Sequence, residues 1–507
     1  MKNMKNMKNM KNFVSVYLIL ALGLVSCTEE LAETVYSDLV VENAYENESD
    51  AEGLILSVYG ALRGTNWGTY YEYDYLNVSE QPTDTYGRDL WGASALELGT
   101  WNNNEGEILN LWDGAYKTIG AANFAISILE GMPIDESVKA GYIGEAKFLR
   151  ALAYHDLAFN FGDVILNLGE TNEDLPISSQ AEVIAQVVQD LSDAESVLGN
   201  SSTPGRASRG AALALRAKTH LNAKNWTEAA NDAAAVMGSG EYSLLASVED
   251  VFNVANKASG EWIFAVMSTD DGTGPVSQIG WHALAGTYIE GGWGRISIAV
   301  DFYNSFEPGD TRRNLLNNGF QDGRLRDDDG LPRYYAAEGT PEYDELSLDP
   351  EISLRSLPGN SVVSSKYLGG NDRFEFANGD FAYIGVNYPI LRYADIVLTR
   401  AEALNESGNS GEALTLVNEI RSRSNATPLP DMGQQELRDA ILDERGKEFF
   451  LEGKRRMDLI RSGRYIELWR SNLQSKYPDE NFGYLNEDKV YFPIPQKEID
   501  ANDQLGN

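Results

Sequence analysis

The chain of 507 residues contains one cysteine and only three histidines. A disulfide needs two thiols, and the usual zinc and iron–sulfur sites take several Cys or His ligands. A disulfide within the chain is therefore excluded, and zinc or iron–sulfur sites of this kind have no ligand set. We accordingly expect no cofactor and no metal centre.

Basic residues are also scarce. Lys and Arg number 41 against 77 Asp and Glu, which gives a formal net charge of −36 at pH 7. A body this acidic repels phosphate backbones and anionic lipid headgroups, so we expect no nucleic-acid partner and no folded face lying on a membrane. The charge of the chain remains compatible with neutral or cationic ligands. The hydrophobic fraction of 43% is typical of a globular protein.

Long apolar runs are absent except at residues 13–25, which follow four Met-Lys-Asn repeats. Lysines ahead of a short apolar run are the order of a secretory signal, and the run is shorter than the ~20 residues that span a bilayer. It ends in Leu24-Val25-Ser26-Cys27, which resembles the bacterial lipobox, where the cysteine thiol is acylated. We predict a lipoprotein signal peptide at 1–26 and lipidation of Cys27.

Acidic residues follow the cysteine directly, in Thr28-Glu29-Glu30, and resemble the export signal of some surface lipoproteins. We interpret residues 27–48 as an acidic tether. The predicted location is the outer membrane, facing the cell exterior, with membrane contact only through the N-terminal lipid.

Helical signals dominate the sequence on both sides of residues 238–390. Ser49-Asp50-Ala51-Glu52 and Ser179-Gln180-Ala181-Glu182 are both capping boxes, in which Ser and Glu satisfy free amides at a helix N-terminus. Apolar residues with helical spacing predict long helices over about 137–161 and 180–198.

Two segments predict helical hairpins. Leu221–Ala229 and Leu404–Ala413 both read Leu-Asn, a short turn, Asn, two residues, then Glu-Ala. We expect Asn or Ser to cap the second helix and Ala to allow close helix approach. The pattern resembles tetratricopeptide (TPR) hairpins, and the distance between the copies indicates an interrupted array.

Residues 238–390 are rich in Gly, Pro, Asn, Asp and aromatics, with a strand-like stretch at Trp262–Val266. The prediction is a mainly α fold, with about four pairs of TPR-like helical hairpins as a scaffold and a long irregular elaboration of loops and short strands. The predicted domains are an N-terminal helical part at 49–237, this elaboration at 238–390, and a C-terminal helical part at 391–507.

Several stretches resemble, in order, the signatures of the SusD/RagB family of surface nutrient-binding lipoproteins. The stretches are Glu145–Tyr154, Phe161–Val164, Ala394–Asn405, Asn418–Arg423, Glu444–Phe449, Glu452–Arg461 and Tyr491–Pro495. Met457 departs from the pattern, because the family often has Trp there. The resemblance implies a helical fold with four TPR-like units and a SusC-like TonB-dependent barrel as partner, over which the protein sits as a lid. It also implies capture of oligosaccharides, or in some members peptides, without chemistry.

Aromatic residues gather in two stretches without helical period, 67–101 and 281–306. A flat ring covers the apolar face of a sugar, while Asn, Asp and Arg bond its hydroxyls. We predict one shallow glycan platform built from the loops at 84–102 and 281–293. Its candidate residues are Trp91, Trp101, Trp281, Tyr288 and Trp293 for stacking, with Asp84, Arg88 and Asn102 as polar contacts. Core packing accounts for other aromatics, and Tyr73 and Tyr75 alternate as in a strand.

Titratable residues on the predicted helices have structural interpretations. We expect Arg150, Arg400 and Arg421 to pair with acids, and His155 and His220 to be scaffold residues, whereas His282 lies in the irregular region beside Trp281.

The sequence shows no Gly-x-Ser-x-Gly, no P-loop and no His-Glu-x-x-His motif, so we predict that the protein is not an enzyme. The alternatives are a peptide-binding member of the family, a surface polysaccharide hydrolase with two paired carboxylates, and a purely structural lid. Asp327–Gly330 lacks the spacing of a calcium loop. The hairpins at 208–237 and 393–423, poor in Trp, are expected to contact the barrel.

Overall fold

A computed structural model describes most of the chain after residue 44. The described residues are 45–63, 70–87, 93–170, 173–200, 204–269, 279, 296–317, 319–320, 325–326, 332–333, 336–337, 361–364, 366–367 and 385–505. Residues 46–507 form one compact unit, and residues 1–45 another. The predicted signal peptide and Cys27 lie outside the described residues. None of the helices in the described part combines the length and hydropathy needed to cross a bilayer.

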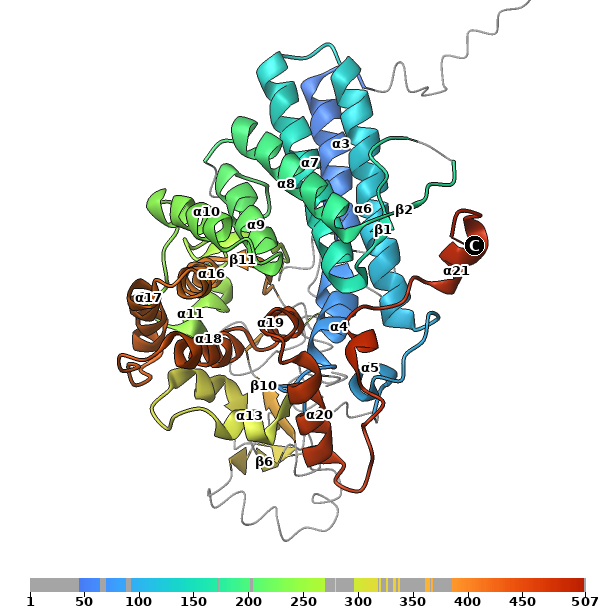
Figure 1. Ribbon diagram of the computed structural model, residues 1–507. Coiled ribbons are helices and arrows are strands. Elements are labelled where there is room, and N and C mark those ends of the chain that lie inside the picture. The colour runs from blue at the N-terminus through green and yellow to red at the C-terminus, as the bar shows by residue number, and fades with distance from the viewer. Residues whose placement is uncertain are drawn as a thin grey trace, which may run out of the picture. The chain divides into compact units, whose positions relative to one another are not determined.

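The N-terminal half is built from long helices packed side by side (Figure 1). Helix α6 packs on α7, and α7 packs on both α3 and α8. Their bounds are α3 (Glu48–Ala61), α6 (Gly106–Gly131), α7 (Glu136–Phe161) and α8 (Gln180–Val197), with α5 (Ala95–Leu98) ahead of α6. The long helices expected at 137–161 and 180–198 are therefore confirmed.

One of the two expected capping boxes is confirmed and the other is shifted. The Ser179 hydroxyl accepts from the Glu182 amide, while the Glu182 carboxylate accepts from the Ser179 amide. At α3 the box is formed instead by Asn47 and Asp50, with the Asp50 carboxylate accepting from the Asn47 amide over 3.1 Å. The helix begins before Ser49 because the Asn47 side chain already satisfies the first free amides.

The strand suggested by Tyr73 and Tyr75 is wrong. Residues Tyr70–Tyr75 form a π-helical turn, η1, that continues into α4 (Leu76–Glu80). The hydroxyls of Tyr70 and Tyr71 both donate to one oxygen of the buried Asp156, over 2.9 and 2.5 Å. Consecutive residues of a strand point to opposite faces and could not reach the same carboxylate, so this shared acceptor favours the helical turn.

The two hairpins predicted from their turns are present and lie against each other. They consist of α9 (Arg209–Asn222) with α10 (Trp226–Gly238), and α16 (Tyr393–Glu406) with α17 (Ser410–Arg423). Helix α10 packs on α16, and Leu221, Ala229 and Ala403 form one buried cluster between them. The expected capping role of Asn is wrong, because neither Asn225 nor Asn409 makes a side-chain cap.

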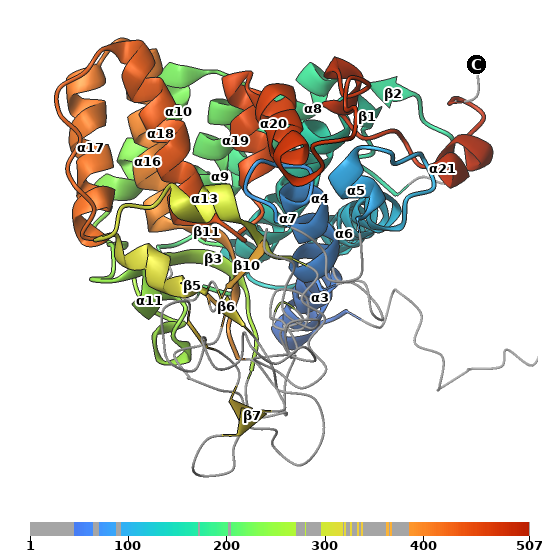
Figure 2. The same cartoon turned by 90° about the horizontal axis from the view of Figure 1, so that it is seen from below.

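The interruption at 238–390 is mixed, as expected, in its described parts. Strand β3 (Trp262–Val266) pairs antiparallel with β11 (Tyr388–Arg392), and β10 (Ser361–Ser364) pairs with β4 (Ile298–Ala299) and β5 (Leu316–Asn317). Figure 2 shows these strands on one side of helices α16 and α18. The short pairs are β1 (Val164–Ile165) with β2 (Ile177–Ser178), β6 (Gly319–Phe320) with β9 (Ala336–Ala337), and β7 (Leu325–Arg326) with β8 (Pro332–Arg333). The short helices here are α11 (Val248–Val251), η2 (Val254–Asn256), α13 (Val300–Asn304) and η3 (Thr311–Leu315). The domain boundaries at 238 and 390 stay predictions.

The C-terminal part is helical and closes on the N-terminal part. Its elements are α18 (Gln434–Phe449), α19 (Arg455–Ser462), α20 (Tyr465–Lys476), η4 (Glu487–Lys489) and α21 (Gln496–Ala501). The indole N–H of Trp469 on α20 donates to the Glu97 carbonyl, and the Phe492 amide donates to the Asn160 carbonyl, each over 2.9 Å.

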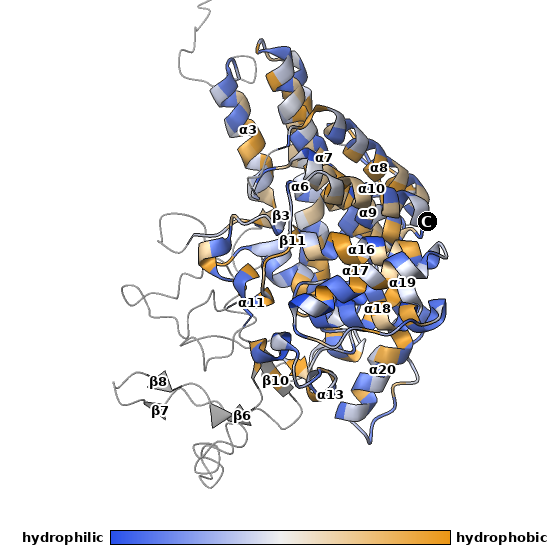
Figure 3. Cartoon of the chain, turned by 90° about the vertical axis from the view of Figure 1, so that its left-hand side faces the viewer, coloured by the Kyte–Doolittle hydropathy of each residue, from blue (hydrophilic) through white to orange (hydrophobic). Residues whose placement is uncertain are grey.

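Helix α18 is largely hydrophilic by residue type, whereas α16 is largely hydrophobic (Figure 3), yet both are buried along much of their length. The charges of α18 are paired in the interior. Glu448 contacts Arg392 at 2.8 Å and Arg312 at 3.2 Å, and all three side chains are fully buried. The family-like stretch Glu444–Arg461 thus contributes to an internal ion network, as Arg421 does through Glu444.

Candidate ligand-binding site

The two loops predicted to form the platform leave the scaffold side by side. Tyr86 and Ile298 form an isolated antiparallel bridge. The Gly87 amide donates to the Ser297 carbonyl, and the Ala299 amide to the Thr85 carbonyl, each over 2.8 Å. The beginning of one loop is therefore tied to the end of the other.

The loop residues themselves are only partly described. Trp91, Arg88, Trp281, Tyr288, Trp293 and His282 lie outside the described residues, as does Asp327–Gly330. Their assignment to a glycan platform stays a prediction. What the structure brings together is two loop stems, the segment at which the first loop begins and the segment that follows the second loop.

Helix α20 holds the first of these stems. The Asn472 amide donates to the carbonyls of Thr83 and Tyr86, over 2.7 and 2.9 Å. The Lys476 ammonium donates to the Gly87 carbonyl over 2.8 Å and to the Glu97 carboxylate over 2.7 Å. These bonds satisfy carbonyls that have no strand partner, and they fix the chain immediately before residue 88.

A hollow of about 220 Å³ opens next to this stem. Its lining combines one aromatic ring with charged and hydroxyl groups, the kinds of side chain that bind a sugar. The lining residues are Asp84, Asp301, Phe302, Ser305, Asp443, Lys447, Arg455, Leu468, Ser471 and Asn472. Sequence reasoning missed all of these except Asp84, because α13, α18, α19 and α20 meet there only through the fold.

Two carboxylates in this hollow differ in their surroundings. Asp84 is held by Arg455 through two bonds of 2.8 and 2.7 Å, so its charge is neutralised and its oxygens are largely occupied. Burial raises the pKa of Asp443 from its ordinary value, against the lowering effect of Arg455 and Lys447. Asp84 therefore acts first as an anchor of the hollow.

Trp101 does not belong to an exposed platform. Its side chain is 6% exposed, and its ring stacks on Trp469 with centroids 5.6 Å apart and planes at 5°. Phe492 meets it edge-on at 5.1 Å, and the Lys489 ammonium lies 5.0 Å from its centroid. The prediction for Trp101 is wrong because residues from the C-terminal part cover the ring, and no local pattern announces that packing.

Asn102, the next residue, is exposed. Its side-chain oxygen accepts from the Asn104 amide over 2.8 Å, which shapes the turn ahead of α6. Its amide group stays a predicted polar contact.

The helical Arg and His residues largely have the structural roles expected of them. Arg150 binds Asp190 through two bonds of 2.8 Å, and Arg400 pairs with Glu412 at the surface. The His155 ring lies 3.0 Å from the Thr219 hydroxyl, and burial lowers the pKa of His155 to about 3, so the ring is neutral. Within the described part of the chain, no group of three Cys, His, Asp or Glu is arranged to hold a metal ion.

Two family models match this chain. The model of the SusD family matches residues 260–507, and a model described as starch-binding and associating with the outer membrane matches residues 63–221. The chain belongs to the SusD family. This confirms the resemblance seen in its signature stretches.

Relatives of known sequence align over much or nearly all of the chain. The SusD-like protein P25 of Formosa agariphila is 26% identical over 97% of this chain and 97% of its own length. The starch-binding protein SusD of Bacteroides thetaiotaomicron is 27% identical over 75% of this chain and 74% of its own.

Solved structures show the same fold. A SusD homologue from Bacteroides thetaiotaomicron superposes with a TM-score of 0.75 and 24% identity, covering 92% of this chain and 97% of its own. A laminarin-binding SusD-like protein superposes with a TM-score of 0.68 and 24% identity, and the superposition covers 90% of this chain and 98% of that protein. The mainly helical, TPR-like fold class is confirmed, and the SusD family to which the chain belongs is a carbohydrate-binding one.

Proposed function

We propose that this SusD family member captures an oligosaccharide at the cell surface and passes it unchanged to a SusC-like TonB-dependent barrel. The observation that carries the proposal is the Tyr86–Ile298 bridge, since it joins the stems of the two loops that hold most of the candidate aromatics. The relatives named for binding starch and laminarin support a glycan as the ligand class.

The ligand would lie over the loops at 84–102 and 281–293, with the polar hollow beside the stem at Asp84. Stacking of one sugar on one ring contributes about 1 kcal/mol beyond its buried area, by analogy with aromatic pairs. A few such contacts, less the cost of ordering the ligand, give dissociation constants from roughly tens of micromolar to millimolar. Because these contacts are neutral, the affinity depends little on salt.

The N-terminus supplies the location in this proposal. Cys27 carries the lipid, and residues 27–48 link it to the helical body. More than one acyl chain gives stable anchoring, whereas a single chain gives only marginal binding. Cys27→Ala should therefore leave a folded protein that no longer fractionates with the outer membrane when its barrel partner is absent.

The deciding experiment is calorimetry on the mature protein, residues 28–507, after a screen of polysaccharides. Trp91→Ala and Trp293→Ala should each weaken binding of the best ligand about tenfold, or about 1.4 kcal/mol. Trp226→Ala is the matched control, because Trp226 packs in the α10–α16 cluster away from both stems. Unchanged affinity in both loop variants would place the ligand elsewhere.

The same material separates the alternatives. Binding that weakens steeply with salt would favour a charged peptide as ligand, and turnover of any glycan would establish a hydrolase. Binding of no glycan or peptide, with the barrel partner retained, would favour a structural lid. Extraction with mild detergent from cells growing on the inducing nutrient should recover a barrel-sized partner, and repeated failure would count against the transporter.

A further inference from the structure

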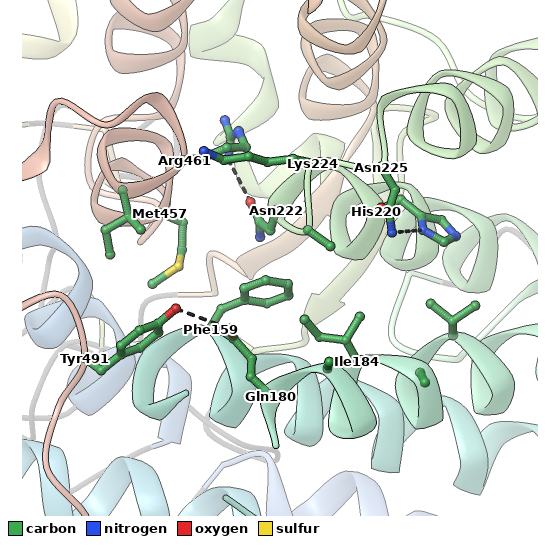
Figure 4. A pocket seen from close by; sticks show the side chains of 15 residues that line it. Phe159, Gln180, Ile184, His220, Asn222, Lys224, Asn225, Met457, Arg461 and Tyr491 are labelled. Carbon is green, nitrogen blue, oxygen red and sulfur yellow. Dashed lines mark hydrogen bonds between the residues drawn. The ribbon is translucent and has the colours of Figure 1, made fainter. Parts of the chain in front are cut away.

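A larger groove, of about 750 Å³, crosses the helical scaffold and shares no lining residue with the hollow beside Asp84. Figure 4 shows its walls: Gln180 and Ile184 of α8 on one side, and Met457 and Arg461 of α19 with the α9–α10 turn on the other. The ring of Tyr491, which is 40% exposed, stands at one end.

The lining is mainly apolar and contains no Asp or Glu, although 77 of the 507 residues of the chain are acidic. Aliphatic side chains and Met line much of it, and Phe159 and Tyr491 add two rings. Such a surface favours apolar side chains, and no carboxylate belongs to the lining of the groove itself.

Most polar groups in the groove already have partners. The Gln180 amide donates to the Ala158 carbonyl over 2.7 Å and accepts from the Tyr491 hydroxyl over 3.3 Å. The side-chain oxygen of Asn222 accepts from the Arg461 guanidinium over 2.7 Å, and Arg461 also binds Glu402. These bonds occupy part of the donors and acceptors that would otherwise be available to the hydroxyls of a sugar.

Lys224 is the exception. It is exposed and lines the groove, and its ammonium has no ion pair or hydrogen bond with any described residue. Its backbone adopts φ +60°, in the left-handed region that glycine prefers. The matching turn of the α16–α17 hairpin has Gly408 there, with φ +84°.

The two turns correspond bond for bond. The Lys224 amide donates to the Leu221 carbonyl, as the Gly408 amide donates to the Asn405 carbonyl, each over 3.0 Å. The following amides of Asn225 and Asn409 also match, each donating over 2.8 Å. A lysine at this position therefore costs stability that a glycine would not, and the turn gives no structural reason for its charge.

We propose that this groove binds an extended segment of a partner protein that presents apolar side chains and a carboxylate, and that the carboxylate pairs with Lys224. The argument for this occupant is complementarity, since the groove offers apolar walls, no acid and one unpaired cation. The partner is the transporter of the proposed function, so the identity of the partner rests on that proposed function.

The test uses the full, lipid-anchored protein in cells growing on the inducing nutrient. Lys224→Glu reverses the free charge, and Ala185→Trp fills the groove. Both should lower recovery of the transporter in mild detergent by at least tenfold. Lys117→Glu, at an exposed lysine of α6 that does not line the groove, is the control and should leave recovery unchanged.

Lys224→Gly separates a binding role from a structural one. Glycine relaxes the left-handed turn, so the thermal midpoint should be unchanged or raised while recovery of the partner falls. A lowered midpoint together with lost recovery would overturn the binding role, because the fold would then explain the loss. Glycan affinity, measured by calorimetry, should be unchanged in all four variants.

The remaining outcomes each decide the inference. Equal recovery with wild type and with both groove variants would overturn it and leave the proposed function intact. Weaker glycan binding in both groove variants would overturn the inference and indicate that the groove binds a sugar. A homodimer that forms with the wild type and is lost in both variants would overturn it as well, and would indicate that a second copy of this chain occupies the groove. If the wild type recovers no partner even after crosslinking, both this inference and the transporter step of the proposed function are overturned. Calorimetry would still decide whether the protein captures a glycan.

Discussion

Gly87 and Ile298 approach so closely that a β-carbon on residue 87 would stand 2.5 Å from the Ile298 carbonyl oxygen. The contact is backbone to backbone, so no side-chain rotation can relieve it. It lies beside the bridge that ties the two loop stems together, and only glycine allows the stems to come this near.

Gly87→Ala should therefore push the stems apart. We expect destabilisation of about 1–3 kcal/mol from the overpacked contact, and glycan affinity lowered in parallel if the platform needs both loops. Urea unfolding and calorimetry measure the two effects. Gly120→Ala on α6, where a β-carbon meets nothing within 4 Å, should instead gain about 0.5–1 kcal/mol. An equal change in unfolding free energy in the two variants would contradict the close approach of Gly87 to Ile298.

Trp101→Ala should act on folding. Removing a ring stacked on Trp469 and covered by Phe492 leaves a cavity, with an expected loss of about 3–5 kcal/mol in unfolding free energy. Denaturant unfolding followed by fluorescence would measure the loss. A stable variant with selectively weakened glycan binding would return Trp101 to the platform.

Arg392 is the test of the internal ion network. Its guanidinium contacts Glu261 at 2.9 Å and Glu452 at 2.8 Å, with all three side chains fully buried. Arg392→Gln should cost about 3–5 kcal/mol, because it leaves buried carboxylates without their counter-charge. The partly exposed pair of Arg400 and Glu412 is the matched comparison, and Arg400→Gln should cost about 0–1 kcal/mol. Similar losses in both variants, measured by urea unfolding, would show that burial of the network does not matter.

Asp74 predicts that stability falls as pH rises from about 4 to about 8. Burial raises the pKa of Asp74 to about 8, although the Asn110 amide donates to it over 3.1 Å. The unfolded carboxyl titrates near 4, so the folded state binds the proton more firmly. This contribution is complete below pH ~4 and is lost as pH rises towards ~8, by about 1.4 kcal/mol per pH unit.

Asp74→Asn removes this titration. The variant should become steadily more stable relative to wild type as pH rises from ~5 to ~8, and the difference should then level off. Thermal melts across this pH range measure it. Asp113→Asn, at a partly exposed surface pair with Lys497, is the matched comparison at the surface. A constant difference between the Asp74 variant and wild type would mean that Asp74 is ionised throughout.

The sequence alone determined features that depend on neighbours along the chain. The capping box of Ser179 and Glu182, the strand at Trp262–Val266 and the two hairpin turns are all encoded within a few residues. The ordered signature stretches identified the family for the same reason, since their residues can be read without knowing what they contact. The prediction that the two aromatic-rich loops share a site gains support from the paired stems, but it came from composition rather than from contacts.

Only the tertiary structure decided which rings and charges are covered. Trp101 lies in loop sequence yet is buried, because Trp469 and Phe492 reach it from the far end of the chain. The charges of α18 lie in a segment that is hydrophilic by residue type, and Arg392 and Arg312 arrive from other elements to pair with them. Burial and pairing are properties of contacts between distant residues, which local spacing does not encode. For the same reason, the groove at Lys224 became visible only once α8, α19 and the α9–α10 turn were placed together.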